Sequence, residues 1–352
     1  MTLEDVRIYG AGLSGLVSAI NLARGGHQVT VYEKEENIGG DEHCHPSVQM
    51  TPLHLQQMER YVGIALASCF SPLGAFRGYI GSRKCVFSPK DLYVVERGPR
   101  ASSLDYFLYK RALEEGVSFE FSHPLSSEEL GSIPEHSIIA TAGYSKIVGA
   151  LGLPYVRFKQ FDTHLRTDLE NVSIAYFGDF TSDYGYIATK NGLLSAQLSG
   201  PFRLSQGNLD TFTDLVKETE GIDLERWSSI IADFPKKARL FTQFAGKTFV
   251  LAGDVAGFLD PFFGFGVSGA LISGKIAATG ILSRQKALQE FQRFTSPLNR
   301  DLLVHTLYWH LPLKKLILSQ VMKFQENRLS LVKRSIPGFM DEDWLKIISI
   351  GE

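Results

Sequence analysis

The sequence has few cysteines, no excess of charge of either sign and no long apolar run. Its three cysteines, Cys44, Cys69 and Cys85, are an odd number without paired spacing, which indicates reduced thiols in a cytosol rather than a disulfide scaffold. The formal net charge of -2 leaves no basic footprint for nucleic acid. No apolar run approaches the roughly 18 residues that a membrane-spanning helix needs. No basic and apolar leader precedes the first strand, so we expect a cytoplasmic protein.

The length predicts two folding units rather than one. A chain of 352 residues that is 44% apolar and 21% charged has the composition of an ordinary globular protein. Single cores stop growing below this length, so we expect a cofactor domain with a smaller lobe.

A glycine-rich turn near the amino end lies between two strands. Residues 6–9 form a short apolar strand, residues 10–15 read G-A-G-L-S-G, and an apolar helix runs to about Arg24. Residues 28–32 form a second strand that ends at Glu33. In this context a G-x-G-x-x-G pattern predicts dinucleotide binding. The alternative, a βαβ unit whose glycines serve packing alone, leaves Glu33 unexplained.

Each part of this turn has a physical task. Gly10 permits the tight turn, Gly12 lets the backbone approach a pyrophosphate, and Gly15 lets helix and strand pack closely. The helix N-terminus offers unpaired amides, and Glu33 can accept a hydrogen bond from a ribose hydroxyl. The motif alone does not distinguish FAD from NAD. The cofactor-binding residues predicted here are Gly10, Ala11, Gly12, Leu13, Ser14, Gly15, Glu33 and Lys34.

A second glycine-rich segment follows a buried strand at residues 248–252 and precedes an apolar helix at about residues 268–282. It resembles the G-D-A-A-G-x-x-D-P-x-x-G-x-G signature of the geranylgeranyl reductase family, within the wider superfamily of aromatic hydroxylases and flavin halogenases. Only Val255 departs from the signature. The matching residues are Gly253, Asp254, Ala256, Gly257, Asp260, Pro261, Gly264 and Gly266.

The resemblance implies FAD as the cofactor, and the residue chemistry agrees with it. The Asp254 carboxylate can accept hydrogen bonds from ribityl hydroxyls, and Gly264 and Gly266 let backbone amides approach the isoalloxazine ring. The following helix N-terminus would stabilise negative charge on the reduced ring. The cofactor-binding residues predicted in this segment are Gly253, Asp254, Pro261, Gly264, Phe265, Gly266 and Val267.

Two further segments resemble parts of the same superfamily. Arg97 or Arg100, before a helix that starts near Ser103, resembles the arginine of an R-x-x-F-D-x-x-L segment, which would place one of them near the flavin or its phosphates. In the alternative interpretation, both arginines form surface salt bridges. Ala142 and Gly143 follow an apolar strand and resemble a small-residue turn that packs beside FAD. No second G-x-G-x-x-G occurs, so we expect NAD(P)H, or a protein electron donor, to act as a transient reductant.

The remaining segments predict the other units of the chain. The fold class expected is α/β, with a Rossmann-like FAD-binding domain of the glutathione reductase type, an antiparallel β-sheet substrate lobe and a helical C-terminus. The FAD-binding domain comprises residues 1–72, 96–150 and 246–285. Alternating polar and apolar stretches assign residues 73–95 and 151–245 to the lobe, and residues 286–352 form the helical region.

Candidate catalytic residues lie in two places. Tyr184 and Tyr186 belong to a segment that resembles the Y-x-W-x-F-P-K segment bordering the substrate cavity of geranylgeranyl reductases, although an aromatic hairpin is also an ordinary core feature. The halogenase motif W-x-W-x-I-P has no match in the chain. Cys44, with His45 beside it, resembles a cysteine that lies close to the flavin in that family. An inert loop is the alternative there, and too few ligands are evident nearby for a metal site.

The resemblance implies a flavin-dependent reductase. We expect it to reduce C=C bonds of a small hydrophobic, isoprenoid-type substrate by hydride transfer from flavin N5. A monooxygenase of the aromatic hydroxylase type is the alternative, and a protein that binds FAD only for structure is a third interpretation. Beyond residue 291 apolar leucines alternate with lysines and arginines, a pattern typical either of a helix capping the cofactor domain or of peripheral membrane contact.

Overall fold

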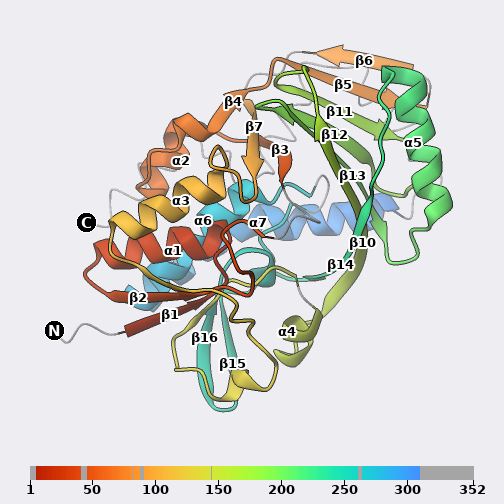
Figure 1. Cartoon of the computed structure of the whole chain (residues 1–352). Helices are drawn as coiled ribbons and strands as arrows, with labels where there is room; N and C mark the ends of the chain where they lie inside the picture. Colours follow the sequence, from red (N-terminus) through yellow and green to blue (C-terminus); the bar gives the residue numbers. More distant parts are fainter. Residues whose placement is uncertain are drawn as a thin grey trace.

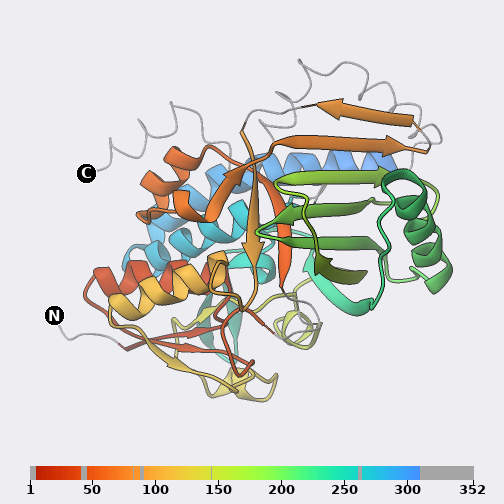
Figure 2. The same ribbon diagram turned by 45° about the horizontal axis from the view of Figure 1, so that its top comes forward.

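The computed structural model describes residues 5–40, 46–81, 83–87, 91–143, 145–260 and 264–309. Two units lie side by side in it (Figure 1). A sheet with helices packed on it forms the nucleotide domain, and a second sheet covered on its outer face by one long helix forms the lobe. Turning the molecule shows that the face of the second sheet away from this helix is turned toward the nucleotide domain (Figure 2).

The nucleotide domain is built on six strands in the order β15-β16-β9-β1-β2-β8. The predicted strand–turn–helix–strand unit is present as β1, α1 and β2, with β1 and β2 parallel. Only the edge strand β15 runs antiparallel to its neighbour in this sheet. The strands are β1 (Asp5–Tyr9), β2 (Gln28–Tyr32), β8 (Ser118–Glu120), β9 (Ile138–Ile139), β15 (Phe241–Phe244) and β16 (Lys247–Leu251).

Helices cover this sheet, and two of them touch at their backbones. The Ser18 hydroxyl of α1 donates to the Gly274 carbonyl of α6 at 2.8 Å, and a Cβ on Gly274 would lie 2.5 Å from the Ser14 carbonyl oxygen. The α1–α6 pair therefore has no room for a side chain at Gly274. The helices of this part of the chain are α1 (Leu13–Arg24), α2 (Leu55–Val62), α3 (Leu104–Glu114), α4 (Ser145–Ala150), α6 (Val267–Leu282) and α7 (Arg284–Trp309).

The lobe is a seven-stranded sheet in the order β14-β10-β13-β12-β11-β5-β6. Its outer face is apolar and packs on α5 (Gln206–Glu220), where Phe212 is fully buried. The sheet is antiparallel, as predicted, except that β11 runs parallel to β5. Its strands are β5 (Ala75–Ile80), β6 (Arg83–Phe87), β10 (Tyr155–Arg166), β11 (Val172–Phe177), β12 (Gly185–Lys190), β13 (Leu193–Pro201) and β14 (Ser228–Pro235).

A small third sheet joins the two units. Because of it, and because of the position of β15, the domain boundaries differ from those expected. The boundary expected between residues 95 and 96 falls within strand β7 (Leu92–Arg97), which pairs with β3 (Ser47–Pro52) and β4 (Phe70–Pro72) rather than with a strand of the lobe sheet. Strand β15 belongs to the nucleotide domain although it precedes residue 246. Cross-strand pairing decides both assignments, and the pairing partner of a short strand is not visible in its own sequence.

The contact between α1 and α6 makes a testable prediction. Gly274→Ala should destabilise the fold by about 1–3 kcal/mol, because its methyl group would overlap backbone that cannot move without separating the helices. Gly149→Ala is the control: it lies in helix α4 with no heavy atom near its Cβ position, and alanine should be neutral or stabilise it by up to about 1 kcal/mol. Urea titration of both variants measures this. Equal stability of the two would contradict the close packing.

Candidate cofactor and substrate site

Two glycines of the first turn serve packing. A Cβ on Gly15 would lie 1.9 Å from the Gly10 carbonyl oxygen, and a Cβ on Gly10 would lie 2.6 Å from the Ala140 carbonyl oxygen at the end of β9. These contacts bring the turn and the start of α1 directly against the sheet. As expected, the position of Gly15 requires a residue without a side chain. The group that a side chain would meet there is the Gly10 carbonyl of the same turn.

Gly12 differs from these two because its Cβ position is open. No heavy atom lies within 4 Å of it, and Gly12 is the N-cap of α1 without any side-chain hydrogen bond to the helix. By contrast, Ser103 caps α3 and Ser205 caps α5 with their hydroxyls. Helix α2 also lacks such a cap, so the missing cap alone identifies nothing. Together with the open space, the free α1 amides make a fitting anion site.

Glu33 is tied to the same turn. Its Oε2 accepts the Ala11 amide at 2.7 Å and its Oε1 accepts the Glu35 amide at 3.1 Å. The carboxylate at the end of β2 therefore lies against the glycine turn, where a ribose would also lie. Leu13 and Ser14 are buried, so from these positions only backbone groups can reach a cofactor. Lys34 is exposed and pairs with Glu35.

The second glycine segment meets the first. Gly253 follows β16 with φ at 71°, and a Cβ there would lie 2.6 Å from Ser14 Oγ. Its amide donates to the Ser273 hydroxyl of α6 at 2.8 Å. Segments that are more than two hundred residues apart in the chain are thus in direct contact at the start of α1.

The N-terminus of α6 lies beside a carboxylate. Gly266 is the N-cap of α6 and has no side-chain cap, and its Cβ position is 3.9 Å from Asp254 Oδ1. Gly264 has no heavy atom within 4 Å of its Cβ position, whereas Val267 is buried in the core. Phe265 is half-buried, and its carbonyl accepts the Asp260 amide at 3.2 Å. Pro261 lies outside the described residues.

Arg97 is the inward-facing member of the two candidate arginines. Its guanidinium forms a bidentate pair with Asp105 of α3, with Nε–Oδ2 at 2.7 Å and Nη2–Oδ1 at 2.9 Å. Burial raises the pKa of Asp254, and the charge of Arg97 opposes that rise, which places both groups in one electrostatic neighbourhood. Arg100 is more exposed and pairs with Glu96 at 3.1 Å.

The two candidate tyrosines lie on the face of the lobe sheet turned to the nucleotide domain. They contact the cluster of Val48, Val94 and Ala175, between the lobe and the small third sheet. Burial raises the pKa of both phenols, and for Tyr186 the charge of Arg97 opposes that rise. Both phenols therefore stay protonated and can donate hydrogen bonds.

Other predicted residues have different surroundings. Gly143 joins the domains, because its carbonyl accepts the Asp233 amide of β14 at 2.7 Å and a Cβ on it would lie 2.4 Å from the Asp233 carbonyl oxygen. Ala142 beside it is exposed. Cys44 and His45 lie outside the described residues, as does the chain beyond Trp309 with its basic helix pattern.

One polar residue on the lobe sheet was missed by the sequence analysis. Asp162 of β10 is 6% exposed, and its Oδ1 accepts the Gln160 and Gln197 side-chain amides at 2.7 Å and 2.5 Å. Burial raises its pKa to about 6, although both amides act in the opposite direction. The available signal was an acid within a stretch of alternating polar and apolar residues that the sequence assigned to the lobe.

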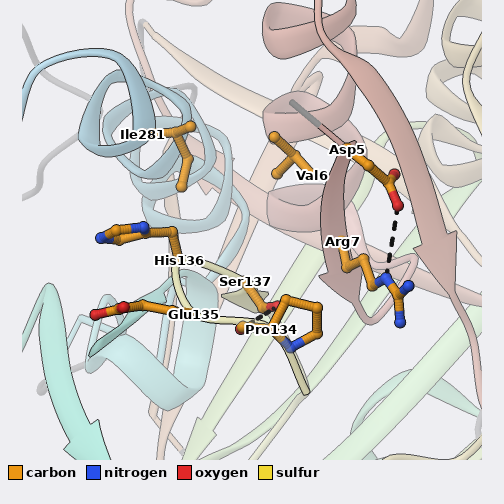
Figure 3. Close-up of a pocket in the computed structure, with 8 residues that line it drawn as sticks. All are labelled: Asp5, Val6, Arg7, Pro134, Glu135, His136, Ser137 and Ile281. Atoms are coloured by element: carbon orange, nitrogen blue, oxygen red, sulfur yellow. Dashed lines mark hydrogen bonds and ion pairs between the residues drawn. The ribbon is translucent and has the colours of Figure 1, made fainter. Parts of the chain in front are cut away.

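A pocket of about 290 Å³ lies elsewhere (Figure 3). It is at the amino ends of β1 and β9, whereas ligands of open α/β sheets bind at the carboxyl ends. Its neighbours are Asp5, Val6, Arg7, Pro134, Glu135, His136, Ser137 and Ile281. Within the described ranges, no group of three or more His, Cys, Asp or Glu residues could hold a metal. No helix in that same part of the chain is long and apolar enough to cross a membrane.

The buried Asp162 carboxyl predicts a pH-dependent stability. Its folded-state pKa of about 6 lies above the usual aspartate value of 3.8, so the fold is most stable at low pH and loses stability as the pH rises toward and through about 6. The full penalty is about 3 kcal/mol, of which roughly half develops between about pH 5 and about pH 8. Asp162→Asn removes this titration. Urea unfolding at both pH values should show wild type losing about 1.5 kcal/mol relative to the variant, and parallel pH profiles would contradict the burial.

Comparisons with known proteins agree with this geometry. Residues 8–49 match the family of NAD(P)-binding Rossmann-like domains. The chain is also 44% identical over 46 residues to the flavin-containing monooxygenase FMO GS-OX-like 6 of Arabidopsis thaliana, a match that spans 13% of this chain and 10% of the relative. The family match covers the first glycine turn and the elements around it.

Solved structures match almost the whole chain. A geranylgeranyl bacteriochlorophyll reductase-like protein of Thermoplasma acidophilum superposes with a TM-score of 0.69 at 17% identity, covering 98% of this chain and 95% of that one. The p-nitrophenol 4-monooxygenase of Pseudomonas putida gives 0.66 at 11% identity, covering 94% and 96%. The flavin-dependent brominase Bmp2 gives 0.63 at 15% identity, covering 97% and 95%. The predicted resemblance is confirmed for the fold, and the chain therefore has the fold shared by these flavoprotein reductases, monooxygenases and halogenases.

Proposed function

We propose that this chain is an FAD-dependent oxidoreductase that reduces C=C bonds of a substrate with an isoprenoid-type apolar part. The observation that carries the proposal is the contact of Ser14 with Gly253, which brings two uncapped helix N-termini and the Asp254 carboxylate to one site. A domain that binds only NAD needs the first turn but has no use for the second.

The residues present fit FAD along its length. The open space at Gly12 and the α1 amides would hold the pyrophosphate, with Glu33 beside the adenosine ribose. Asp254 would accept from the ribityl chain, and the α6 N-terminus would stabilise negative charge on the ring. When bound, FAD would supply a hydride from its N5 atom. NAD(P)H or an electron-donor protein would serve as the reductant. NAD(P)H would bind only transiently, because the sequence has no second dinucleotide motif to hold it.

The lobe supplies the substrate side of the site. Ala175 and Ala188 on its inner face are buried with Val48 and Val94 of the third sheet, and such surroundings exclude water and suit an apolar chain. Tyr186 adds a protonated phenol close enough to respond to the charge of Arg97. It would orient a polar atom of the substrate by donating a hydrogen bond.

A monooxygenase is the second candidate, and a specific observation favours it. Gln160, Asp162, Gln197 and Ser199 make one end of the inner face polar, which suits a small polar aromatic better than a purely apolar chain. Halogenation is disfavoured because the W-x-W-x-I-P motif is absent from the sequence.

The open position of Gly12 generates a prediction about the cofactor. Gly12→Val should keep the stability of the fold but weaken FAD binding by at least about tenfold, because its side chain would fill the space facing the phosphates. Gly207→Val is the matched control, since it changes a glycine in the first turn of α5, which is capped by Ser205. FAD affinity is measured by reconstitution and fluorescence quenching. If Gly12→Val bound FAD as tightly as wild type, the pyrophosphate would not lie at this turn.

The reaction itself is tested without oxygen. The holoprotein is reduced photochemically, mixed anaerobically with an isoprenoid alkene, and followed by flavin absorbance and product mass. A reductase should become reoxidised with formation of the saturated product. Reoxidation that requires dioxygen and adds an oxygen atom to the substrate would support the monooxygenase instead. An absence of substrate-dependent reoxidation in either atmosphere would leave FAD a structural role.

A further inference from the structure

One row of side chains crosses the lobe sheet from its polar end to its apolar end. Strand register places Asp162 of β10 opposite Gln197 of β13, Gln197 opposite Tyr186 of β12, and Tyr186 opposite Ala175 of β11. Residues directly opposite each other in neighbouring strands point to the same face. These four side chains therefore form one continuous line, which we call the cross-strand row.

The cross-strand row faces the nucleotide domain. Its sequence neighbours Phe161, Leu198 and Ile187 belong to the cluster around Phe212 of α5 on the opposite face, and side chains alternate between faces along a strand. On the inner face, Tyr186 and Ala175 pack with residues of β3 and β7. The polar end with Asp162 and Gln197 therefore opens on the side where the proposed substrate would lie.

Among the residues that the structure describes, the Asp162 carboxylate finds hydrogen-bond donors for only one of its two oxygens. Both amides that approach it, from Gln160 and Gln197, donate to Oδ1, whereas Oδ2 has no hydrogen-bond partner. Gln160 is held in place because its Oε1 accepts the Ser199 hydroxyl at 3.3 Å. A buried carboxylate oxygen without a donor is costly, and a ligand that supplies the donor recovers that cost on binding.

Two observations connect Asp162 to the rest of the site. The charges of Asp162 and Arg97 both act on the Tyr186 phenol, and Arg97 and Asp254 interact electrostatically in turn. The same neighbourhood thus runs from the polar end of the cross-strand row to the proposed flavin site.

We propose that Asp162 selects substrates that carry a neutral hydroxyl group, which donates a hydrogen bond to its Oδ2. This inference rests on the proposed function, because it assumes that the substrate lies between the cross-strand row and the flavin. A neutral alcohol or phenol supplies this donor without the cost of moving an ammonium charge out of water into a buried position. The substrate is accordingly amphiphilic: its hydroxyl lies at Asp162, and its apolar part lies toward the partly exposed rings of Tyr184 and Tyr186.

Matched ligand pairs test the proposal on the FAD-loaded protein. Farnesol and farnesyl methyl ether differ in the hydroxyl donor, which the ether replaces by a methoxy group, as do 4-methylphenol and 4-methylanisole, whose phenol stays neutral at neutral pH. Farnesylamine replaces the hydroxyl by a cation. Dissociation constants come from calorimetry. In wild type, the hydroxyl member of at least one pair should bind about tenfold or more tightly than its ether, the range expected for a hydrogen bond to a charged acceptor.

The variants locate the selectivity. Asp162→Asn is nearly isosteric and should reduce the alcohol-to-ether ratio to about twofold or less, because it replaces a charged acceptor by a neutral amide. Asp168→Asn makes the same chemical change at an exposed position at the end of β10 and should keep the wild-type ratio. Thermal unfolding and flavin content of each variant check that the folded holoprotein is compared.

Three results would overturn the inference. These are equal affinity for hydroxyl and ether in wild type, an unchanged ratio in Asp162→Asn, and tighter binding of farnesylamine than of farnesol. None of these three results would bear on FAD binding or on flavin chemistry. Failure of the proposed function is a separate outcome, because the purified protein would then take up no FAD.

Discussion

The close approach of α1 and α6 is the constraint on which the site depends. Gly274 and Gly253 bring two backbones against Ser14, at distances that no side chain could enter, and the Ser18 hydroxyl bonds across the pair. Because α6 begins directly after the second glycine segment, this packing fixes where its N-terminus lies relative to that of α1. Two uncapped helix N-termini are thereby held at fixed positions relative to each other, as the proposed FAD site requires. Separation of the helices would leave each glycine turn with its local shape but without the other.

The lobe sheet is subject to a different constraint. It must be stable although one of its faces is turned toward the proposed ligand site. One face is filled by aliphatic and aromatic side chains packed on α5, and this burial can hold the sheet together without help from the inner face. The inner face is thereby free to carry groups that folding alone would disfavour. Asp162 is such a group, since its burial works increasingly against stability as the pH rises from about 4 and does so fully above about 6. Polar residues that oppose folding and lie next to a ligand site are typical of function.

The sequence predicted element boundaries and residue roles best in the segments that contain glycine. The bounds of β2 and the end of α1 follow from Gly25 and Gly26 directly after the helix, and the separate tasks of Gly12 and Gly15 are visible in what surrounds their Cβ positions. The sequence predicted less about the contacts between neighbouring strands. Spacing could not choose between Arg97 and Arg100, because the choice depends on how the end of β7 and the segment after it pack against α3, where Arg97 meets Asp105.

Register explains the remaining differences. The parallel pairing of β5 with β11 and the pairing of β7 with β3 join segments whose sequences carry no mark of each other. Asp162 was missed for the same reason, since only the alignment of β10, β13 and β12 places it in line with Tyr186.

The departures from the reductase motif and the polar end of the cross-strand row are consistent with one change of substrate. Tyr186 stands where the family has tryptophan, and it adds a hydroxyl to the inner face. Ala188 stands where the family has phenylalanine, and it lies in line with Ser195 and Ser173 on the neighbouring strands. The first departure makes this face more polar and the second makes it less bulky. Gln197 and Asp162 extend the polarity over the next two strands, β13 and β10, beyond the strand that carries the motif. A face altered in this way has less apolar surface for a prenyl chain and more hydrogen-bonding capacity, which is the combination that an amphiphilic substrate requires.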